Sequence, residues 1–247
     1  MRNLIAAELL KLRTTRSFWA YVASIVAFVP VSIALSITVG SDQNPLTSSD
    51  GIRGVFSASS SGLLMAVLIG ITMSAGEFRN NTATPTFLIT PDRKRVMAAK
   101  VLAGGILGVL LAAGSAVATV AVATPWLHAR NVDVNLLSAD VITPLAGALL
   151  SLALGVIFGI GIGGLIPNQT IAITVLVVWS SIIEALLTGF VPEVGRWLPT
   201  GAASALGGTW TIEGGLLAFW PAALVLAGYS ASTAAAGTHL ITRKDMT

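Results

Sequence analysis

The chain has 247 residues, of which 54% are hydrophobic and only 10% are charged. A soluble globular domain carries about 25% charged residues, so these charges are too few to cover a water-facing surface. Cysteine is absent, which excludes disulfides, thiolate metal ligands and a cysteine nucleophile. The composition therefore predicts an all-α, polytopic membrane protein with the lipid bilayer around most of its surface.

Apolar runs of the length that crosses a bilayer, about 20 residues, occur about six times. They cover residues 18–40, 55–76, 96–124, 139–166, 170–191 and 214–241. The third and fourth are long, which predicts tilt or extension past the bilayer. Turn residues such as Pro125 and Pro167 separate the runs, and Ser138 and Asn168 stand where N-caps of the fourth and fifth helices would fall. We expect a single transmembrane domain over residues 1–247.

The first run follows basic residues, as the apolar part of a signal peptide would. It is too long for that role and lacks a clear small-x-small cleavage site, so we expect a retained span. In residues 2–16 before it, leucines and an isoleucine recur at helical spacing. This pattern predicts an amphipathic helix in the inner membrane interface, although a plain basic flank to the first span fits equally well.

The distribution of Lys and Arg predicts the orientation. With the N-terminus in the cytoplasm, eleven of the fourteen basic residues lie inside, and only Arg53, Arg130 and Arg196 lie outside. Six spans then return the C-terminus to the cytoplasm. The high pI of 9.7 reflects this topology, so we expect no nucleic-acid partner.

Residues 77–95 form the only sizeable cytoplasmic loop between the expected spans. Pro85 and Pro91 interrupt it, and Phe87–Ile89 is its apolar core. A short helix that begins at Asn81, Thr82 or Thr84 and ends at Pro91 would carry an apolar tip with a basic flank. Such a helix suits docking into a groove of a soluble partner, and an ordinary connector is the equal alternative.

Several short sequences resemble one family. They are residues 8–17 (ELLKLRTTRS), residues 76–79 (GEFR), Thr-Pro at 84–85 and 90–91, and Ala-Lys at 99–100. Together they resemble the permease subunits of bacterial ATP-binding-cassette exporters of the ABC-2 type. The likeness extends over the whole chain in span number and loop length, but its specific residues lie in the first hundred positions.

The resemblance implies an elbow helix at residues 2–16, six spans, a second permease copy or paralogue, and a separate ATPase subunit that binds ATP and Mg. It also implies a multi-pass location in a plasma membrane, the bacterial inner membrane. The residues expected to couple the chain to the ATPase are Glu77, Phe78, Arg79, Thr82, Thr84, Pro85, Thr86, Phe87, Leu88, Ile89, Pro91 and Arg93. Because Glu77 and Arg79 are two residues apart and cannot face each other on a helix, each should find another partner, with Glu8 a candidate for Arg79.

Catalytic motifs are absent from the sequence. There is no Gly-x4-Gly-Lys-Ser/Thr phosphate loop and no His-Glu-x-x-His. We therefore expect no catalytic residue, no metal and no cofactor on this chain. A self-sufficient secondary transporter or channel is the first alternative function, and it would more often place ionisable residues or broken helices at the membrane midplane. An intramembrane enzyme is the second, and it needs a paired nucleophile and base.

Glu184 is the candidate pathway residue. It lies about 21 Å along a helix from Thr170, within the outer third of the membrane core, where an ionisable group usually faces an interior or an aqueous cavity. Two alternatives are a side chain wetted by the outer headgroups and an ion pair with Arg196. Residues 192–210, with two tryptophans and several glycines, are either a re-entrant cap or an external loop with interface anchors.

Small residues recur at a spacing of four in the fourth run. Gly155, Gly159 and Gly163 would let another helix approach closely, and Gly104 and Gly108 would do the same in the third run. We expect these glycines to serve packing within one subunit.

Overall fold

The computed structural model describes residues 1–40, 44–79, 92–208 and 215–243. These residues form helices joined by turns, with no strand among them, which confirms the all-α prediction. The helices are α1 (Arg2–Arg13), α2 (Arg16–Thr38), α3 (Ser49–Phe56), η2 (Ser57–Ser60), α4 (Leu63–Arg79), α6 (Arg93–Ala129), α7 (Ala139–Leu165), α8 (Gln169–Val178), η3 (Trp179–Ile183), α9 (Glu184–Phe190), α10 (Pro192–Gly195), α11 (Pro199–Gly207) and α12 (Phe219–Arg243).

Five helical segments of the described chain are long and apolar enough to cross a membrane. They are Phe18–Thr38, Ser49–Arg79, Arg93–Ala129, Ala139–Leu165 and Gln169–Phe190. Five of the six expected runs fall in these segments. The sixth run corresponds to α12, which has 25 residues but is less apolar, because serine, threonine and tyrosine interrupt it.

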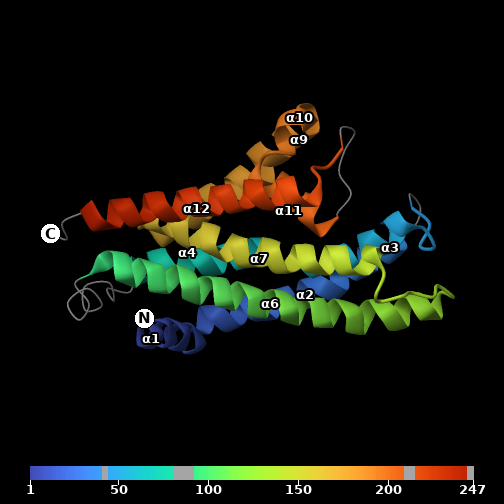
Figure 1. Ribbon diagram of the computed structural model, residues 1–247, viewed down its shortest axis with the longest axis horizontal. Coiled ribbons are helices and arrows are strands. Elements are labelled where there is room, and N and C mark those ends of the chain that lie inside the picture. The colour runs from blue at the N-terminus through green and yellow to red at the C-terminus, as the bar shows by residue number, and fades with distance from the viewer. Residues whose placement is uncertain (41–43, 80–91, 209–214, 244–247) are drawn as a thin grey trace.

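The long helices lie side by side along the longest axis, with α7 in the middle of the bundle (Figure 1). Helix α7 packs against α4, α6 and α12, and α1 packs against α6 at one end. The last turns of α12 lie at this same end in Figure 1. An ordered contact supports this, because the guanidinium of Arg93 at the start of α6 donates to the carbonyl oxygen of Ile241 near the end of α12, at 3.0 Å.

Glycines bring α4 and α7 unusually close. A Cβ atom at Gly159 would overlap the carbonyl oxygen of Val67, and one at Gly70 would overlap that of Val156. Gly161 of α7 likewise lies against the backbone of Thr233 in α12. The regularly spaced Gly155, Gly159 and Gly163 therefore serve packing of α7 against α4 within one subunit, and Gly161 allows α12 to approach on another side.

Helix boundaries depart from the sequence expectation at two places. Pro125 does not end a helix, since α6 continues to Ala129 and reaches 37 residues, or about 55 Å. The length of α6 exceeds the roughly 30 Å core of a bilayer, in keeping with the expected tilt or extension of the third run. The second departure is Ser138, whose side chain makes no capping bond to α7, whereas Asn168 caps α8 as expected by accepting from the amide of Ile171.

Residues 192–207 fold into the two short helices α10 and α11. Helix α11 packs against α7 and α12, and Ala202, Ala203 and Leu206 are buried in this contact. A Cβ atom at Gly147 of α7 would overlap the carbonyl oxygen of Leu206. Helix α11 is thus part of the packed core, whereas Val194 of α10 and Trp197 after it are exposed.

Candidate functional site

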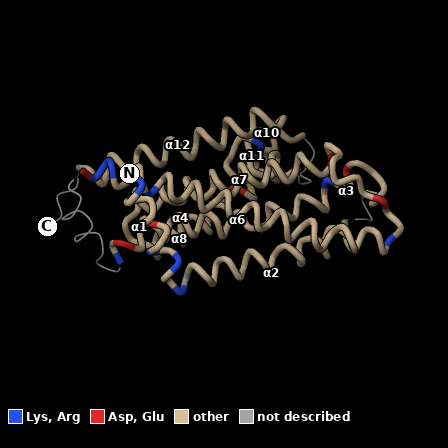
Figure 2. Tube along the Cα trace, turned by 60° about the horizontal axis from the view of Figure 1, so that its bottom comes forward, with Lys and Arg blue, Asp and Glu red and all other residues tan. Residues whose placement is uncertain are grey.

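Charged residues gather at the two ends of the bundle, and the middle is nearly free of them in the view of Figure 2. At the end that carries α3, Arg53 and Asp140 form a partly exposed pair at 2.7 Å. At the opposite end, where α1 lies, the charged residues form a larger and much more buried cluster. This cluster is the candidate functional site.

Lys100 is at the centre of the cluster and is only 2% exposed. Its ammonium nitrogen lies 2.6 Å from Oε2 of Glu8, 3.1 Å from Oε1 of Glu77 and 2.9 Å from the carbonyl oxygen of Met73. An ammonium group has three donors, and these three acceptors match them. The buried charge is therefore compensated by hydrogen bonds as well as by opposite charge, as burial requires.

Lys11 joins the same two carboxylates from the more exposed side. Its nitrogen is 2.8 Å from Oε1 of Glu8 and 2.8 Å from Oε1 of Glu77. The two lysines and two glutamates have no net charge as a group. They connect three helices that are distant in sequence, namely α1, the last turn of α4 and the first third of α6.

Local sequence explains how each side chain reaches the cluster. Glu8 and Lys11 are three residues apart, so they lie on the same face of α1. Leu9 and Leu12 of α1 pack against the apolar core, together with Phe78 of α4. This packing orients α1, and it leaves Glu8 and Lys11 directed at the ends of α4 and α6.

The pKa values of the two α1 residues reflect these contacts. Burial by itself raises the pKa of the Glu8 carboxyl, but attraction and hydrogen bonding from Lys100 and then Lys11 hold that pKa below its ordinary value of 4.5. Burial lowers the pKa of Lys11, but hydrogen bonds and attraction from Glu77 and Glu8 raise it above 10.5. Both groups are therefore charged at neutral pH.

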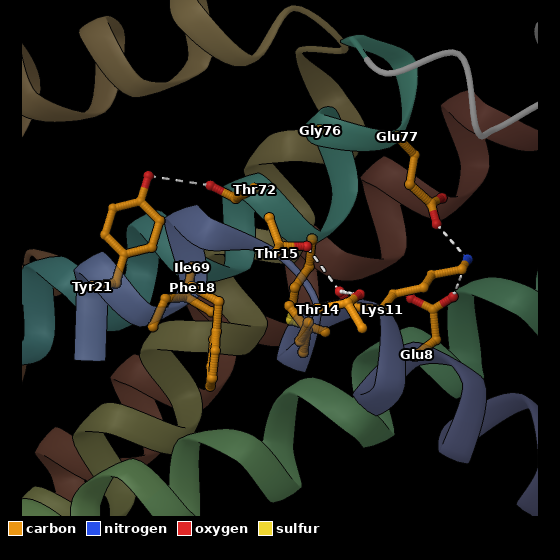
Figure 3. Close-up of a pocket in the computed structure, with 12 residues that line it drawn as sticks. Glu8, Lys11, Thr14, Thr15, Phe18, Tyr21, Ile69, Thr72, Gly76 and Glu77 are labelled. Carbon is orange, nitrogen blue, oxygen red and sulfur yellow. Dashed lines mark hydrogen bonds and ion pairs between the residues drawn. The ribbon is translucent and has the colours of Figure 1, made fainter. Parts of the chain in front are cut away.

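A cavity of about 250 Å³ adjoins the cluster, between α1, α2 and α4. Glu8, Lys11 and Glu77 lie at one end of it, and Tyr21 and Thr72 at the other (Figure 3). Leu12, Phe18, Ile69 and Met73 supply apolar lining. The cavity thus has polar and apolar parts and lies where the first membrane span begins.

The structure brings part of the predicted coupling set together. Glu77 is in the cluster, Phe78 packs against the core, Arg79 is the exposed last residue of α4, and Arg93 binds α12. Glu8 binds Lys100 and Lys11 instead of Arg79. Eight predicted residues lie outside the described part of the chain: Thr82, Thr84, Pro85, Thr86, Phe87, Leu88, Ile89 and Pro91.

The sequence-based prediction omitted Lys100 and Lys11 from the site. Lys100 stands alone in an apolar stretch, with Ala98 and Ala99 before it and Val101 and Leu102 after it. An isolated lysine in such a stretch needs a buried partner, and that signal was available in the sequence. The identity of the partner was not, because Glu8 is 92 residues away.

Glu184 lies in a second polar place, and it is 1% exposed. Its Oε1 accepts a hydrogen bond from the amide of Thr200 at 2.6 Å, so the carboxylate caps the N-terminus of α11. Arg196 pairs with Glu193 instead, at 3.4 Å. Glu184 also borders a largely apolar cavity of about 260 Å³ between α4, α7, η3 and α11, next to the π-helical turn of η3.

The two polar sites differ in their structural role, because Glu184 caps one helix and the cluster joins several. The cluster of Glu8, Lys11, Glu77 and Lys100 holds three helix segments in a fixed arrangement, because breaking either buried lysine–glutamate contact strands a charge. Within the described residues, no group of three or more His, Asp or Glu side chains is arranged to hold a metal ion.

A scan against known protein families finds no match to the chain, and a search of curated proteins finds none either.

Proposed function

We propose that the chain is the permease subunit of an ATP-binding-cassette exporter, which forms the substrate pathway and couples to a separate ATPase subunit. The buried cluster of Glu8, Lys11, Glu77 and Lys100 carries this proposal. It ties the segments on both sides of residues 80–91 to each other and to α1. The family resemblance of residues 8–17, 76–79 and 99–100 falls on the same residues.

The mechanical argument starts from the positions of Glu77 and Lys100. Glu77 is two residues before the end of α4, and Lys100 is seven residues after the start of α6. A force on the intervening loop therefore reaches both helices within two turns. Since Glu8 and Lys11 bind the same two side chains, α1 moves with them as one unit. The expected coupling residues Phe87, Leu88 and Ile89 would transmit motion of the ATPase to this unit.

The proposal includes six spans with both termini in the cytoplasm. Helix α12 supplies the sixth, since it packs along the full membrane helix α7 and its last turns contact the start of α6. A helix that is protected on one side by α7 tolerates more small polar residues than one surrounded by lipid. The excess of Lys and Arg at the α1 end supports an inside location for that end, with α1 as the proposed elbow helix.

The pathway is proposed to form between this chain and a second permease copy or paralogue. In the most apolar stretch of Gln169–Phe190, only 17% of the residues are buried, which is the lowest fraction of the five candidate spans. Side chains such as Ile171, Ile182 and Leu186 are therefore available to a second copy as well as to lipid. The apolar character of the spans favours a hydrophobic or amphipathic cargo, and the bacterial inner membrane is the expected location.

Cysteine cross-linking tests the coupling assignment. The chain has no native cysteine, so single cysteines at positions 86–89 report without background. They should cross-link to the co-expressed partner ATPase, and a cysteine at Asp133 should not. Truncation of an anchor in a docking groove costs about 1 kcal/mol or more of binding free energy, so Phe87→Ala and Leu88→Ala should weaken co-purification. Cross-linking from another segment alone would refute the assignment.

Reporter fusions test the orientation separately. A reporter after Thr247 or near Asn80 should report the cytoplasm, and one within residues 41–50 should report the outside. An external signal near Asn80 would overturn both the orientation and the cytoplasmic coupling loop. Transport by the purified chain without any ATPase would favour a secondary transporter or channel instead.

A further inference from the structure

A groove between the start of α6 and the end of α12 takes no part in the proposed coupling. It measures about 610 Å³ and lies at the end of the bundle where α6 begins and α12 ends (Figure 1). The hydrogen bond from the guanidinium of Arg93 to the carbonyl oxygen of Ile241 holds the two helices together there. Because α6 is a candidate span and α12 is the proposed sixth, the groove begins at the depth of lipid headgroups and runs toward the membrane core.

Helix α6 lines this groove with one of its faces. The lining residues are Lys94, Met97, Ala98, Val101 and Leu102, at positions i, i+3, i+4, i+7 and i+8, which share one side of a helix. Lys94 is exposed, and so is Leu102, two turns further along. The face is therefore charged at the end of the helix and apolar over the next two turns.

Helix α12 lines the groove with a face of matching polarity. Thr238, His239 and Thr242 lie nearest the end of the helix, and Ala234 and Ala235 lie about one turn deeper. The small alanine side chains leave space between the two helices. Since α12 ends where α6 begins, its polar residues lie at the same end of the groove as the lysine, and its alanines lie along the apolar part.

The polar end of the groove offers both donors and acceptors. Lys94 has three N–H donors, and the imidazole of His239 has at least one. Among the described residues, neither side chain has an ion-pair partner. Thr238 donates its proton to the carbonyl oxygen of Ala234 at 2.7 Å. Thr242 donates to that of His239 at 2.8 Å, so both threonine oxygens offer lone pairs to a ligand.

The charge at this end favours an anion. Residues 93–95 are Arg-Lys-Arg, and Asp92 is the one acidic residue in the described segments 92–102 and 234–243, which hold both faces of the groove. The Asp92 carboxylate accepts from the amide of Arg95 as the cap of α6. Basic pockets between membrane helices attract anionic lipid headgroups. A ligand that fits therefore combines an anionic group, hydroxyl donors and a hydrocarbon part.

We propose that this groove binds an anionic phospholipid whose headgroup carries hydroxyl groups, as that of phosphatidylglycerol does. The phosphate lies at Lys94 and His239, and a headgroup hydroxyl donates to Thr242. The acyl chains lie along Val101 and Leu102, and the bound lipid links α6 to α12 from the membrane side. The inference rests on the proposed sixth span, because α12 must lie in the bilayer, and it needs no ATPase.

Native mass spectrometry of the full chain, purified in detergent without any ATPase, tests this. The probes are phosphatidylglycerol, phosphatidylethanolamine and phosphatidylcholine with identical acyl chains, in equimolar competition. We expect phosphatidylglycerol to be retained about fivefold over each of the others, the effect of one lysine near an anionic lipid. Equal retention of the three lipids would overturn the proposal. If the reporter after Thr247 still reports the cytoplasm, that result refutes the lipid site and leaves the proposed topology standing.

Charge variants at two neighbouring positions locate the headgroup. Lys94→Met should bring the retention of phosphatidylglycerol close to that of the other two lipids. Arg95→Met removes the same charge one residue further along, at an exposed position outside the groove lining, and should keep the preference. An unchanged preference in Lys94→Met would refute the headgroup position. An equal loss in Arg95→Met would also overturn the proposal, because general attraction to a basic surface would then explain the retention.

A second matched pair tests the apolar part of the groove. Ala98→Phe places a ring in the groove from an exposed position and should lower the retention of phosphatidylglycerol several-fold. Ala113→Phe adds the same ring to an exposed position of α6 outside the lining and should not. Full retention in folded Ala98→Phe would refute the groove as the site. If Ala98→Phe does not fold, Ala235→Phe on the facing helix is read in the same way.

Discussion

The ammonium of Lys100 lies 2.6 Å from the carboxylate of Glu8, and both side chains are buried although 92 residues separate them. This pair joins the N-terminal helix α1 to the third candidate membrane span. It differs in kind from the pair of Arg53 and Asp140 at the opposite end, where the arginine is 44% exposed. Burial decides how much each pair contributes to stability, because water screens the exposed Arg53–Asp140 pair but not the buried Lys100–Glu8 pair.

Removing the buried lysine should destabilise the protein strongly. Lys100→Met keeps much of the side-chain volume but leaves Glu8 and Glu77 without their buried partner. Breaking a buried pair in this way costs about 3–5 kcal/mol. Thermal unfolding in detergent, followed by circular dichroism, measures the loss. Arg53→Met is the matched control, and an exposed pair there is worth about 0–1 kcal/mol. Equal shifts for the two variants would contradict the central role of Lys100.

Stability should depend on pH through the α1 residues. The pKa of Glu8 is lowered, so its stabilising contribution is complete above about 4.5 and is lost as the pH falls through the lower folded-state pKa. The pKa of Lys11 is raised, so its contribution is complete below about 10.5 and is lost as the pH rises through the higher folded-state pKa.

A titration of Glu8→Gln checks the acid side of this prediction. The difference in melting temperature between Glu8→Gln and the unmodified chain should be constant near neutral pH and should shrink as the pH falls below 4.5. Glu193→Gln changes a side chain that is 80% exposed and should leave the acid limb unaltered. A difference that stays constant into strong acid would mean that Glu8 is not part of a charged network.

The contact between α4 and α7 should not accept a methyl group at Gly159. A Cβ atom there meets the carbonyl oxygen of Val67, and backbone on both sides cannot yield cheaply. Gly159→Ala should therefore destabilise by about 1–3 kcal/mol or more, as overpacking does. At Gly114 the same change meets nothing within 4 Å and should stabilise the helix slightly, by about 0.5–1 kcal/mol. Melting temperatures of the two variants should move in opposite directions.

Glu184 should act on stability through the helix that it caps. Glu184→Gln retains an acceptor for the amide of Thr200 and should cost about 1 kcal/mol, whereas Glu184→Leu leaves that amide unpaired and should cost about 1–3 kcal/mol. Thermal unfolding ranks the two variants. Should Glu184→Gln instead alter transport with unchanged stability, the residue would belong to the pathway, as its position in the fifth apolar run first indicated.

The sequence by itself determined the class of the protein and the positions of most helices. Apolar runs of about 20 residues have no stable place in water, and lipid offers backbone groups no partners, so such runs must form helices in a membrane. Five of the six expected runs fall in segments long and apolar enough to span. The uneven distribution of Lys and Arg also follows from sequence, since charges are excluded from the bilayer core.

Only the tertiary structure decided which polar groups meet. The sequence offered Glu8 as one candidate partner of Arg79, and it left Glu184 to a pathway, to headgroups or to Arg196. The fold instead joins Glu8 to Lys100 and Glu184 to the amide of Thr200. The sequence also predicted a turn at Pro125, but α6 continues past this residue to Ala129. A buried charge takes whichever partner helix packing brings within hydrogen-bond distance, and packing depends on the fit between backbones, such as that of Gly159 against Val67. This fit depends on helices that are distant in sequence, so the hydrophobic periodicity of a single segment does not predict it.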